Sequence, residues 1–329
     1  MRLGIVSARD VRSRGIGEEI LRHIRSRYPE ASVRTDFGPP PPEVLILVGD
    51  DRFLLEALRE TAPETAVLTV GDGFLAEVPP DRAKDALQAV MKGRHWIETR
   101  LRLEVNADGR RLPPALNEVA LGTRKGAGFL RYSLEVDGER VWRDGGDGVV
   151  ICSPTGSTGY GLSAGGPVVM ENAEALVVVP VCSADGQRPL VVPSRSTVAV
   201  TDIESRLGCD VVLDGSVRSR VRSSGFTVRA SDNPARFVRL GEARYLRTFG
   251  KLRAKRSVPE VPVGAPPSAK FLFRLLSDQG PMTTRQITAD SGLPERTVRN
   301  ALAYLIREGL ARRSPSLRDA REAVFGLRH

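Results

Sequence analysis

The feature that most constrains this chain is a loop of mainly Gly, Ser, Thr and Pro that directly follows a short apolar strand. The strand is expected at residues 149–151 and leads into CSPTGSTGYGLSAGGP at 152–167. A loop of this composition exposes backbone N–H groups and hydroxyls, which suit a phosphate or a ribose. Its glycines let a ligand approach the backbone closely. We therefore interpret it as a ligand-binding loop, because a surface turn has no need of so long a run.

Residues 1–98 alternate between expected strands and helices. Apolar runs predict the strands, and apolar residues at helical spacing predict the helices between them. The strands are expected at 3–6, 44–48 and 67–70, and the helices at 17–27, 54–60 and 83–92. The run VLILV at 44–48 is continuous, as in parallel strands buried on both faces. This order predicts a Rossmann-like α/β domain with an open sheet.

The chain changes character after residue 98. Short segments rich in Val and Leu are separated by turns such as NADG at 106–109, which predicts a β-rich, sandwich-like second domain over 99–256. Four prolines between residues 257 and 267 indicate a linker.

Residues 268–329 are expected to form a third domain of three helices and a two-stranded wing. The helices are expected at 270–276, 283–289 and 294–308, and the wing at 310–327. This pattern resembles a winged helix-turn-helix, which places its third helix in the major groove of DNA. The resemblance implies base contacts by the third helix and phosphate contacts by the wing, through Arg296, Thr297, Arg299, Asn300, Arg312 and Arg313. A three-helix docking or dimerisation module is the alternative.

The charge distribution favours DNA as the partner of this third domain. Residues 251–329 hold 15 Lys and Arg against 7 Asp and Glu, whereas residues 1–250 hold 34 against 33. A near-neutral body with a basic C-terminal part is typical of a protein that binds a polyanion through that part.

Cysteine, histidine and long apolar runs are all scarce. Cys152, Cys182 and Cys209 are isolated and lack CxxC spacing, and the three histidines are scattered. This predicts a reducing, cytoplasmic location, with no disulfide framework and no metal ion held by protein side chains. No apolar run approaches the roughly 18 residues that span a membrane, so no membrane association is expected.

Several motifs, in order along residues 1–250, resemble those of the NAD kinase family and its ATP-NAD kinase fold. They are GFLAEV at 73–78, LNEV at 116–119, the Asp-Gly at 147–148 with the following loop, RPLVVP at 188–193 and VVLDG at 211–215. Ordered motifs are more specific than any one glycine pattern. The resemblance implies transfer of a phosphoryl group from ATP or polyphosphate to the 2′-hydroxyl of NAD, which makes NADP. It also implies that residues 245–256 close back toward the first domain.

The resemblance assigns roles to individual residues. Asp50, in VGDDR at 48–52, occupies the position of the Asp in the family's GGDGT loop, where it would orient or deprotonate the 2′-hydroxyl. NAD would be bound by Asn117, Glu118, Asp147, Thr158 and Tyr160. The phosphates would be bound by Gly49, Arg52, Gly73, Thr155, Gly156 and Ser157. Mg²⁺ would be carried by the phosphates of the donor.

The loop at 48–52 departs from the family pattern. Val48, Asp51 and Arg52 replace two glycines and a threonine. Asp51 adds a negative charge beside a phosphate site, which we expect a cation to offset, with Arg52 as the candidate.

This departure leaves a second function open, a regulator that uses an NAD kinase fold to sense NAD or NADP and has weak or no kinase activity. A lipid- or sugar-directed kinase of the same superfamily is a third and weaker possibility. By resemblance alone, the chain is expected to be a homodimer or homotetramer.

Overall fold

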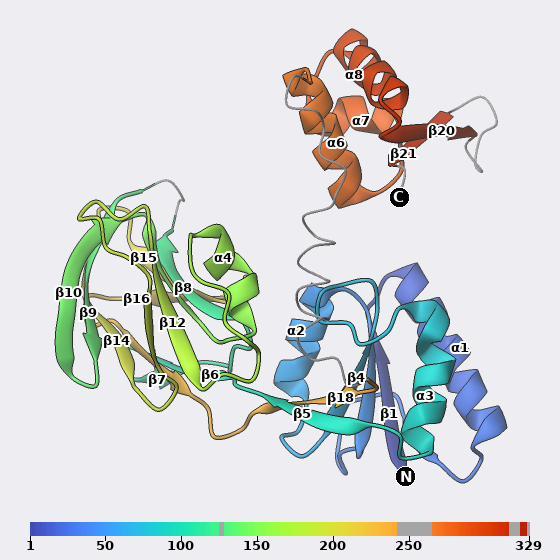
Figure 1. Ribbon diagram of the computed structural model, residues 1–329, viewed down its shortest axis with the longest axis horizontal. Coiled ribbons are helices and arrows are strands. Elements are labelled where there is room, and N and C mark those ends of the chain that lie inside the picture. Colours follow the sequence, from blue (N-terminus) through green and yellow to red (C-terminus); the bar gives the residue numbers. More distant parts are fainter. Residues whose placement is uncertain (125–127, 242–264, 316–322, 328–329) are drawn as a thin grey trace. The chain divides into compact units, whose positions relative to one another are not determined.

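The computed structural model describes residues 1–124, 128–241, 265–315 and 323–327. Internal contacts divide the chain into two compact units, Met1–Arg247 and Thr248–His329 (Figure 1). The segment predicted to close back at 245–256, and the predicted linker up to residue 264, lie outside the described residues. Within the described ranges, no helix is long and apolar enough to cross a membrane.

One part of the first unit is an open sheet between helices. The sheet has the order β2-β1-β3-β4-β18-β5. Neighbouring strands pair in parallel, except that β5 pairs antiparallel with β18. Its strands are β1 (Arg2–Ser7), β2 (Ser32–Arg34), β3 (Val44–Val48), β4 (Ala66–Val70), β5 (Trp96–Arg100) and β18 (Ala235–Arg239). The helices are α1 (Val11–Arg27), α2 (Asp51–Glu60) and α3 (Ala83–Met91). The predicted Rossmann-like arrangement is confirmed.

The two faces of this sheet are covered by different helices. Ile20 and Ile24 of α1 pack with Leu87 of α3 on one face, and the apolar side of α2, including Leu54, packs on the other (Figure 1). Helix α1 begins six residues earlier than predicted, because Asp10 caps it by accepting a hydrogen bond from the backbone N–H of Ser13 at 2.9 Å.

Strand β18 is a part of this sheet that the sequence analysis did not predict. It pairs in parallel with β4 and antiparallel with β5. The chain therefore returns to the first sheet after the β-rich part, and β5 spans the predicted boundary at 98/99. The predicted β-rich domain over 99–256 therefore includes residues of β5 and β18 that belong to the first sheet.

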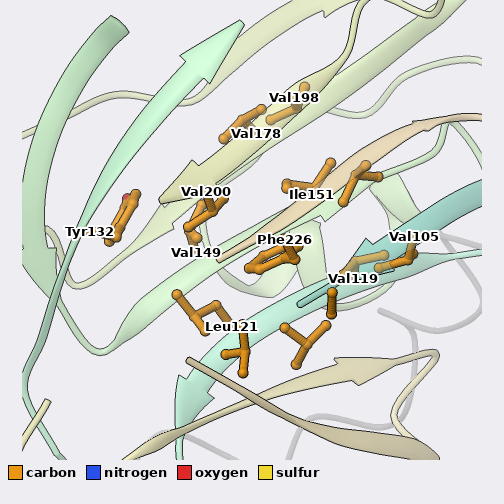
Figure 2. Close-up of a cluster of buried hydrophobic side chains, with 14 of the residues drawn as sticks. Val105, Val119, Leu121, Tyr132, Val149, Ile151, Val178, Val198, Val200 and Phe226 are labelled. Carbon is orange, nitrogen blue, oxygen red and sulfur yellow. The ribbon is translucent and has the colours of Figure 1, made fainter. Parts of the chain in front are cut away.

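The β-rich part consists of two six-stranded sheets, with the orders β10-β9-β14-β17-β6-β7 and β13-β12-β11-β8-β15-β16. The first sheet contains β6 (Leu103–Ala107), β7 (Arg110–Arg111), β9 (Leu130–Val136), β10 (Glu139–Gly146), β14 (Val198–Glu204) and β17 (Phe226–Ala230). The second contains β8 (Glu118–Thr123), β11 (Gly148–Cys152), β12 (Ala175–Val181), β13 (Leu190–Pro193), β15 (Cys209–Leu213) and β16 (Val217–Val221). One buried core joins them, as Figure 2 shows for Val149 and Ile151 facing Val200 and Phe226. This is the predicted sandwich.

The second unit contains three helices and a small antiparallel sheet. Its elements are α6 (Pro267–Gln279), β19 (Met282–Thr283), α7 (Thr284–Ser291), α8 (Glu295–Arg307), β20 (Ala311–Pro315) and β21 (Ala323–Leu327), with the sheet order β19-β21-β20. Thr283 and Gln286 form a capping box at the start of α7, and Gly292 ends α7 with a φ of 63°. The predicted helices and hairpin are present, and β19 is an additional strand.

Candidate functional site

Asp50 lies where the open sheet meets helix α2. Strand β3 ends at Val48, and Asp50 caps α2 by accepting a hydrogen bond from the backbone N–H of Phe53 at 2.8 Å. Asp50 is exposed, whereas Gly49 before it is buried. Open α/β sheets bind ligands at the carboxyl ends of their strands. The exposed carboxylate of Asp50 therefore lies at the edge of the sheet where a bound ligand could give up a proton to it.

Asp51 holds the segment that follows β4. Its carboxylate accepts hydrogen bonds from the backbone N–H groups of Phe74 and Leu75, both at 2.8 Å. Gly73 leaves room for this contact, since a Cβ there would collide with the carboxylate of Asp51. The two backbone donors offset the negative charge that Asp51 adds to the loop.

The predicted offset of Asp51 by Arg52 is wrong. The guanidinium of Arg52 lies 3.2 Å from the carboxylate of Glu56, one turn further along α2, and its side chain is 79% exposed. The i, i+4 spacing on a helix surface explains this pair. A role of Arg52 in phosphate binding stays a prediction.

The Gly/Ser/Thr loop after β11 is held mainly by its own hydrogen bonds. Ser153 accepts from the backbone N–H of Gly156 at 3.2 Å, and Thr158 donates to the carbonyl of Thr155 at 3.2 Å. Ser157 donates to the carbonyl of Pro154 at 2.7 Å and accepts from the N–H of Val169 at 2.9 Å. The hydroxyl proton of Ser157 is therefore used within the loop, and the role of Ser157 in phosphate binding stays a prediction.

Gly156 and Thr155 of this loop differ in what surrounds them. A Cβ at Gly156 would collide with the backbone of Asn117, so this glycine lets the loop pack on the start of β8. The hydroxyl of Thr155 is buried and has no hydrogen-bond partner within the described parts of the chain. A buried polar group of this kind calls for a partner, and a ligand donor or acceptor would supply one.

The predicted NAD-binding residues come together around this loop. Asn117 and Glu118 stand at the start of β8, and the Glu118 carboxylate lies 3.6 Å from the position that a Cβ on Gly159 would take. Tyr160 is exposed, and its pKa is raised by partial burial and by the nearby charges of Asp147 and Glu118. Thr158 is buried.

Asp214, in the VVLDG motif, anchors the Asn117-Glu118 segment. Its carboxylate accepts hydrogen bonds from the backbone N–H groups of Leu116 at 3.0 Å, Asn117 at 2.8 Å and Glu118 at 3.3 Å. It also lies 3.2 Å from the guanidinium of Arg59 on α2, and the two side chains are 1% and 10% exposed. The candidate NAD motif is therefore tied to the helix that Asp50 caps.

A second buried network joins the strands that cross between the two halves of this unit. Arg239 of β18 binds Glu98 at 2.7 Å and Glu77 at 2.8 Å, and Arg100 of β5 binds Glu98 at 3.1 Å and Glu171 at 2.6 Å. Glu77 belongs to the GFLAEV motif, and Glu171 follows the Gly/Ser/Thr loop. The network thus connects the two predicted ligand-binding segments.

The sequence analysis missed Arg59, Arg239 and the structural role of Asp214. The VVLDG motif was recognised, and its Asp before a Gly is the one signal that pointed to this position. No local sequence pattern identifies Arg59 or Arg239, because Asp214 and Glu77, to which they bind, lie 155 and 162 residues away along the chain.

The residues predicted to bind DNA lie on two elements of the second unit. Arg296, Arg299 and Asn300 are exposed on α8, while Thr297 is half-buried. Arg299 pairs with Glu295 on the same helix. Arg312 and Arg313 are adjacent on β20, and only Arg313 lines a surface hollow of about 820 Å³ that Arg285 and Arg299 also line. Neighbouring residues of a strand point to opposite faces, so Arg312 is directed away from this hollow.

Glu118 provides a pH-dependent prediction that does not depend on the ligand. Burial and the charge of Asp214 raise its pKa from 4.5 to about 7. Between these two values the folded protein holds a proton that the unfolded chain has lost, so the free energy of unfolding falls as the pH rises from about 4.5 to 7. The expected loss is on the order of 3 kcal/mol.

Glu118→Gln removes this titration. We expect the variant to gain stability over the wild type as the pH rises, by a margin that is greatest above pH 7. Urea unfolding of both proteins at pH 5 and pH 8 measures the margin. An equal margin at the two pH values would show that Glu118 does not titrate in this range.

Comparison with known proteins places the chain in a family. Residues 116–240 match the model of the ATP-NAD kinase C-terminal domain. The chain is 32% identical over 273 residues to an NAD kinase of Methanothermobacter thermautotrophicus, a match that covers 77% of this chain and 96% of the relative. It is 35% identical over 216 residues to an NAD kinase of Heliobacterium modesticaldum, with 62% and 76% covered.

Solved structures share the fold. An NAD kinase from Archaeoglobus fulgidus in complex with ATP superposes with a TM-score of 0.63 at 27% identity, covering 77% of this chain and 99% of the other. A yeast NADH kinase complexed with NADH superposes with a TM-score of 0.68 at 22% identity, covering 80% and 89%. From the ordered motifs, the match to the family model and the nearly complete coverage of the archaeal relative, the chain belongs to the NAD kinase family.

Proposed function

We propose that this protein is an active NAD kinase, which transfers a phosphoryl group from ATP or polyphosphate to the 2′-hydroxyl of NAD and releases NADP. The observation that carries the proposal is the exposed carboxylate of Asp50 at the N-terminus of α2, in a family whose relatives are NAD kinases. A carboxylate there accepts the hydroxyl proton as the phosphoryl group leaves its donor.

The remaining residues bind and orient the substrates. Asn117, Glu118 and Asp147 lie near Tyr160 of the loop at which NAD would bind, and Asp214 keeps the first two in place through their backbone N–H groups. Mg²⁺ is compatible with this arrangement as an ion carried by the donor phosphates. It is commonly bound by substrate phosphates together with one or two carboxylates, and Asp50 is an exposed carboxylate at the site.

One observation favours the alternative of an NAD-sensing regulator. The carboxylate of Asp51 occupies two backbone N–H groups, those of Phe74 and Leu75, that a phosphate would otherwise be able to use. A sensor would bind NAD without turnover.

A steady-state assay separates the two functions. Full-length protein is incubated with NAD and Mg²⁺, with ATP or polyphosphate as donor, and NADP is measured with an NADP-specific dehydrogenase. We expect NADP to accumulate with at least one donor. Binding of NAD by calorimetry without any NADP from either donor would favour the regulator.

We further propose that the second unit is a winged helix that binds duplex DNA. The order of its elements, helix, strand, helix, helix and hairpin, supports this, as does the hollow beside α8 and the hairpin. Three arginines, Arg285, Arg299 and Arg313, line that hollow. Arginine pairs with phosphate and with guanine edges.

Neighbouring arginines of β20 give a matched test of this surface. Arg313→Gln is expected to weaken DNA binding by the full-length protein and to reduce the salt dependence by about one released counterion. Arg312→Gln, on the opposite face of the same strand, is expected to have a smaller effect. Gel shifts over a series of salt concentrations measure both.

Equal losses in the two variants would place the DNA elsewhere on this unit. If the wild type shows no salt-sensitive binding of duplex DNA, with or without NAD, the unit is a protein-docking module instead.

A further inference from the structure

A cavity of about 200 Å³ lies beside the Arg59–Asp214 pair, within the first unit. Its lining comes from the end of α2 and the residues after it, from both sides of the start of β6, from β7 and the segment after it and from the loop after β17, and includes Arg59, Arg102, Glu104 and Arg111. Two of its side chains, Arg59 and Arg102, are at least nine-tenths buried. The cavity is separate from the loop at which NAD is proposed to bind.

Arg102 is a buried cation without a counterion. It is 6% exposed, its Nε is buried without a hydrogen-bond partner, and no described residue forms an ion pair with it. Burial lowers its pKa, and the charge of Asp214 only partly opposes this shift without a direct contact. Proteins rarely bury a charge without a partner, because the desolvation is costly.

Arg59, which also lines the cavity, has a second buried donor without a partner. Its terminal nitrogens bind Asp214 at 3.2 Å and the hydroxyl of Ser216 at 2.9 Å, whereas its Nε is buried without a partner. Two arginines therefore line one cavity, and each has a buried Nε–H without a partner.

The two carboxylates near the cavity, Glu104 and Asp214, already bind other groups. Glu104 also lines the cavity, but it binds Arg111 at 2.7 Å and Arg229 at 2.6 Å. Asp214 is shared among Arg59 and three backbone N–H groups. The arginines around the cavity thus outnumber the carboxylates, and a neutral water would satisfy an N–H without balancing this charge.

We propose that this cavity is a binding site for a small oxyanion of the phosphate class. An anion with several oxygens can accept from the guanidinium groups of both Arg59 and Arg102, whereas chloride offers a single centre to two planar groups. Arg59 holds Asp214, and Asp214 holds the backbone at Asn117 and Glu118. Occupancy of the cavity therefore stabilises the segment to which NAD is proposed to bind.

Thermal unfolding of the full-length protein tests the site without NAD or turnover. Inorganic phosphate is titrated against chloride at constant ionic strength and pH 7.5, with sulfate and acetate as further arms. We expect a saturable rise in Tm with phosphate and with sulfate that is absent in Arg102→Gln. Acetate is expected to give a smaller rise, and an equal rise would make the site one for carboxylates. Arg220→Gln, which removes an exposed arginine on β16, is the control and keeps the rise.

The comparison with Arg102→Gln separates this cavity from other phosphate sites of the protein, including that of the donor. A rise of the same size in Arg102→Gln would overturn the proposal. Crystals of the wild type grown with selenate provide a readout that needs no variant. Anomalous density within hydrogen-bonding distance of Arg59 and Arg102 is expected, and a cavity without it at saturating selenate would also overturn the proposal.

Discussion

Asp50→Asn is expected to reduce NADP formation by at least about 10²-fold, the usual scale for loss of a general base. The amide keeps the shape of the side chain and can still accept from the N–H of Phe53 to cap α2, so the fold is retained. It cannot accept the proton of the 2′-hydroxyl. Turnover measured with saturating NAD and donor gives the effect on kcat, and calorimetry shows that NAD still binds.

Asp51→Asn is the matched control for this variant. Asp51 is the next residue, and its carboxylate faces the backbone of Phe74 and Leu75. An amide oxygen can still accept one of these hydrogen bonds, so a much smaller loss of kcat is expected. Undiminished turnover in Asp50→Asn, or a greater loss in Asp51→Asn, would remove Asp50 from the role of proton acceptor.

Asp214→Asn is expected to lower the free energy of unfolding by about 3 kcal/mol, because it removes one charge of a buried pair and leaves Arg59 without its counterion. Asparagine tolerates the left-handed backbone at this position, where φ is 46°. Both tryptophans, Trp96 and Trp142, belong to the first unit. Their fluorescence during urea unfolding therefore follows this unit alone.

Asp202→Asn is the control for the Asp214 variant. Asp202 has a similar φ of 49° and also lies 3.1 Å from an arginine, Arg140, but both of these side chains are about half exposed. We expect a loss within about 1 kcal/mol, as for other exposed ion pairs. Equal losses in the two variants would show that the buried pair with Arg59 does not anchor the Asn117-Glu118 segment.

The parts of the fold that local patterns specify were predictable from the sequence. The continuous apolar run at 44–48 is β3, and the helical periodicity before residue 60 is α2. Strand β18 carries the sequence ARFVR, which has no comparable pattern. Its place depends on pairing with β4 and β5, which are distant along the chain, so tertiary contacts decide it.

For the candidate site too, the local motifs were predictable and the long-range contacts were not. The motifs identified which segments meet, including Asn117-Glu118 and the Gly/Ser/Thr loop. They did not show what holds these segments, because Asp214 and Arg59 are 155 residues apart. The charge of Asp51 was recognised, but the backbone N–H groups of Phe74 and Leu75 that bind it were not. Every residue except proline has such a group, so no residue type in the sequence identifies them.

Phosphorus NMR of the reaction product tests the central claim most directly, because it identifies the bond that forms. Wild-type protein is incubated with NAD, Mg²⁺ and ATP, and in a second sample with polyphosphate. We predict a new phosphomonoester resonance that matches the 2′-phosphate of NADP, and none when the NAD analogue lacks the 2′-hydroxyl. An unchanged NAD spectrum with both donors, while calorimetry shows NAD bound to the same protein, would contradict the assignment of this chain as an active NAD kinase.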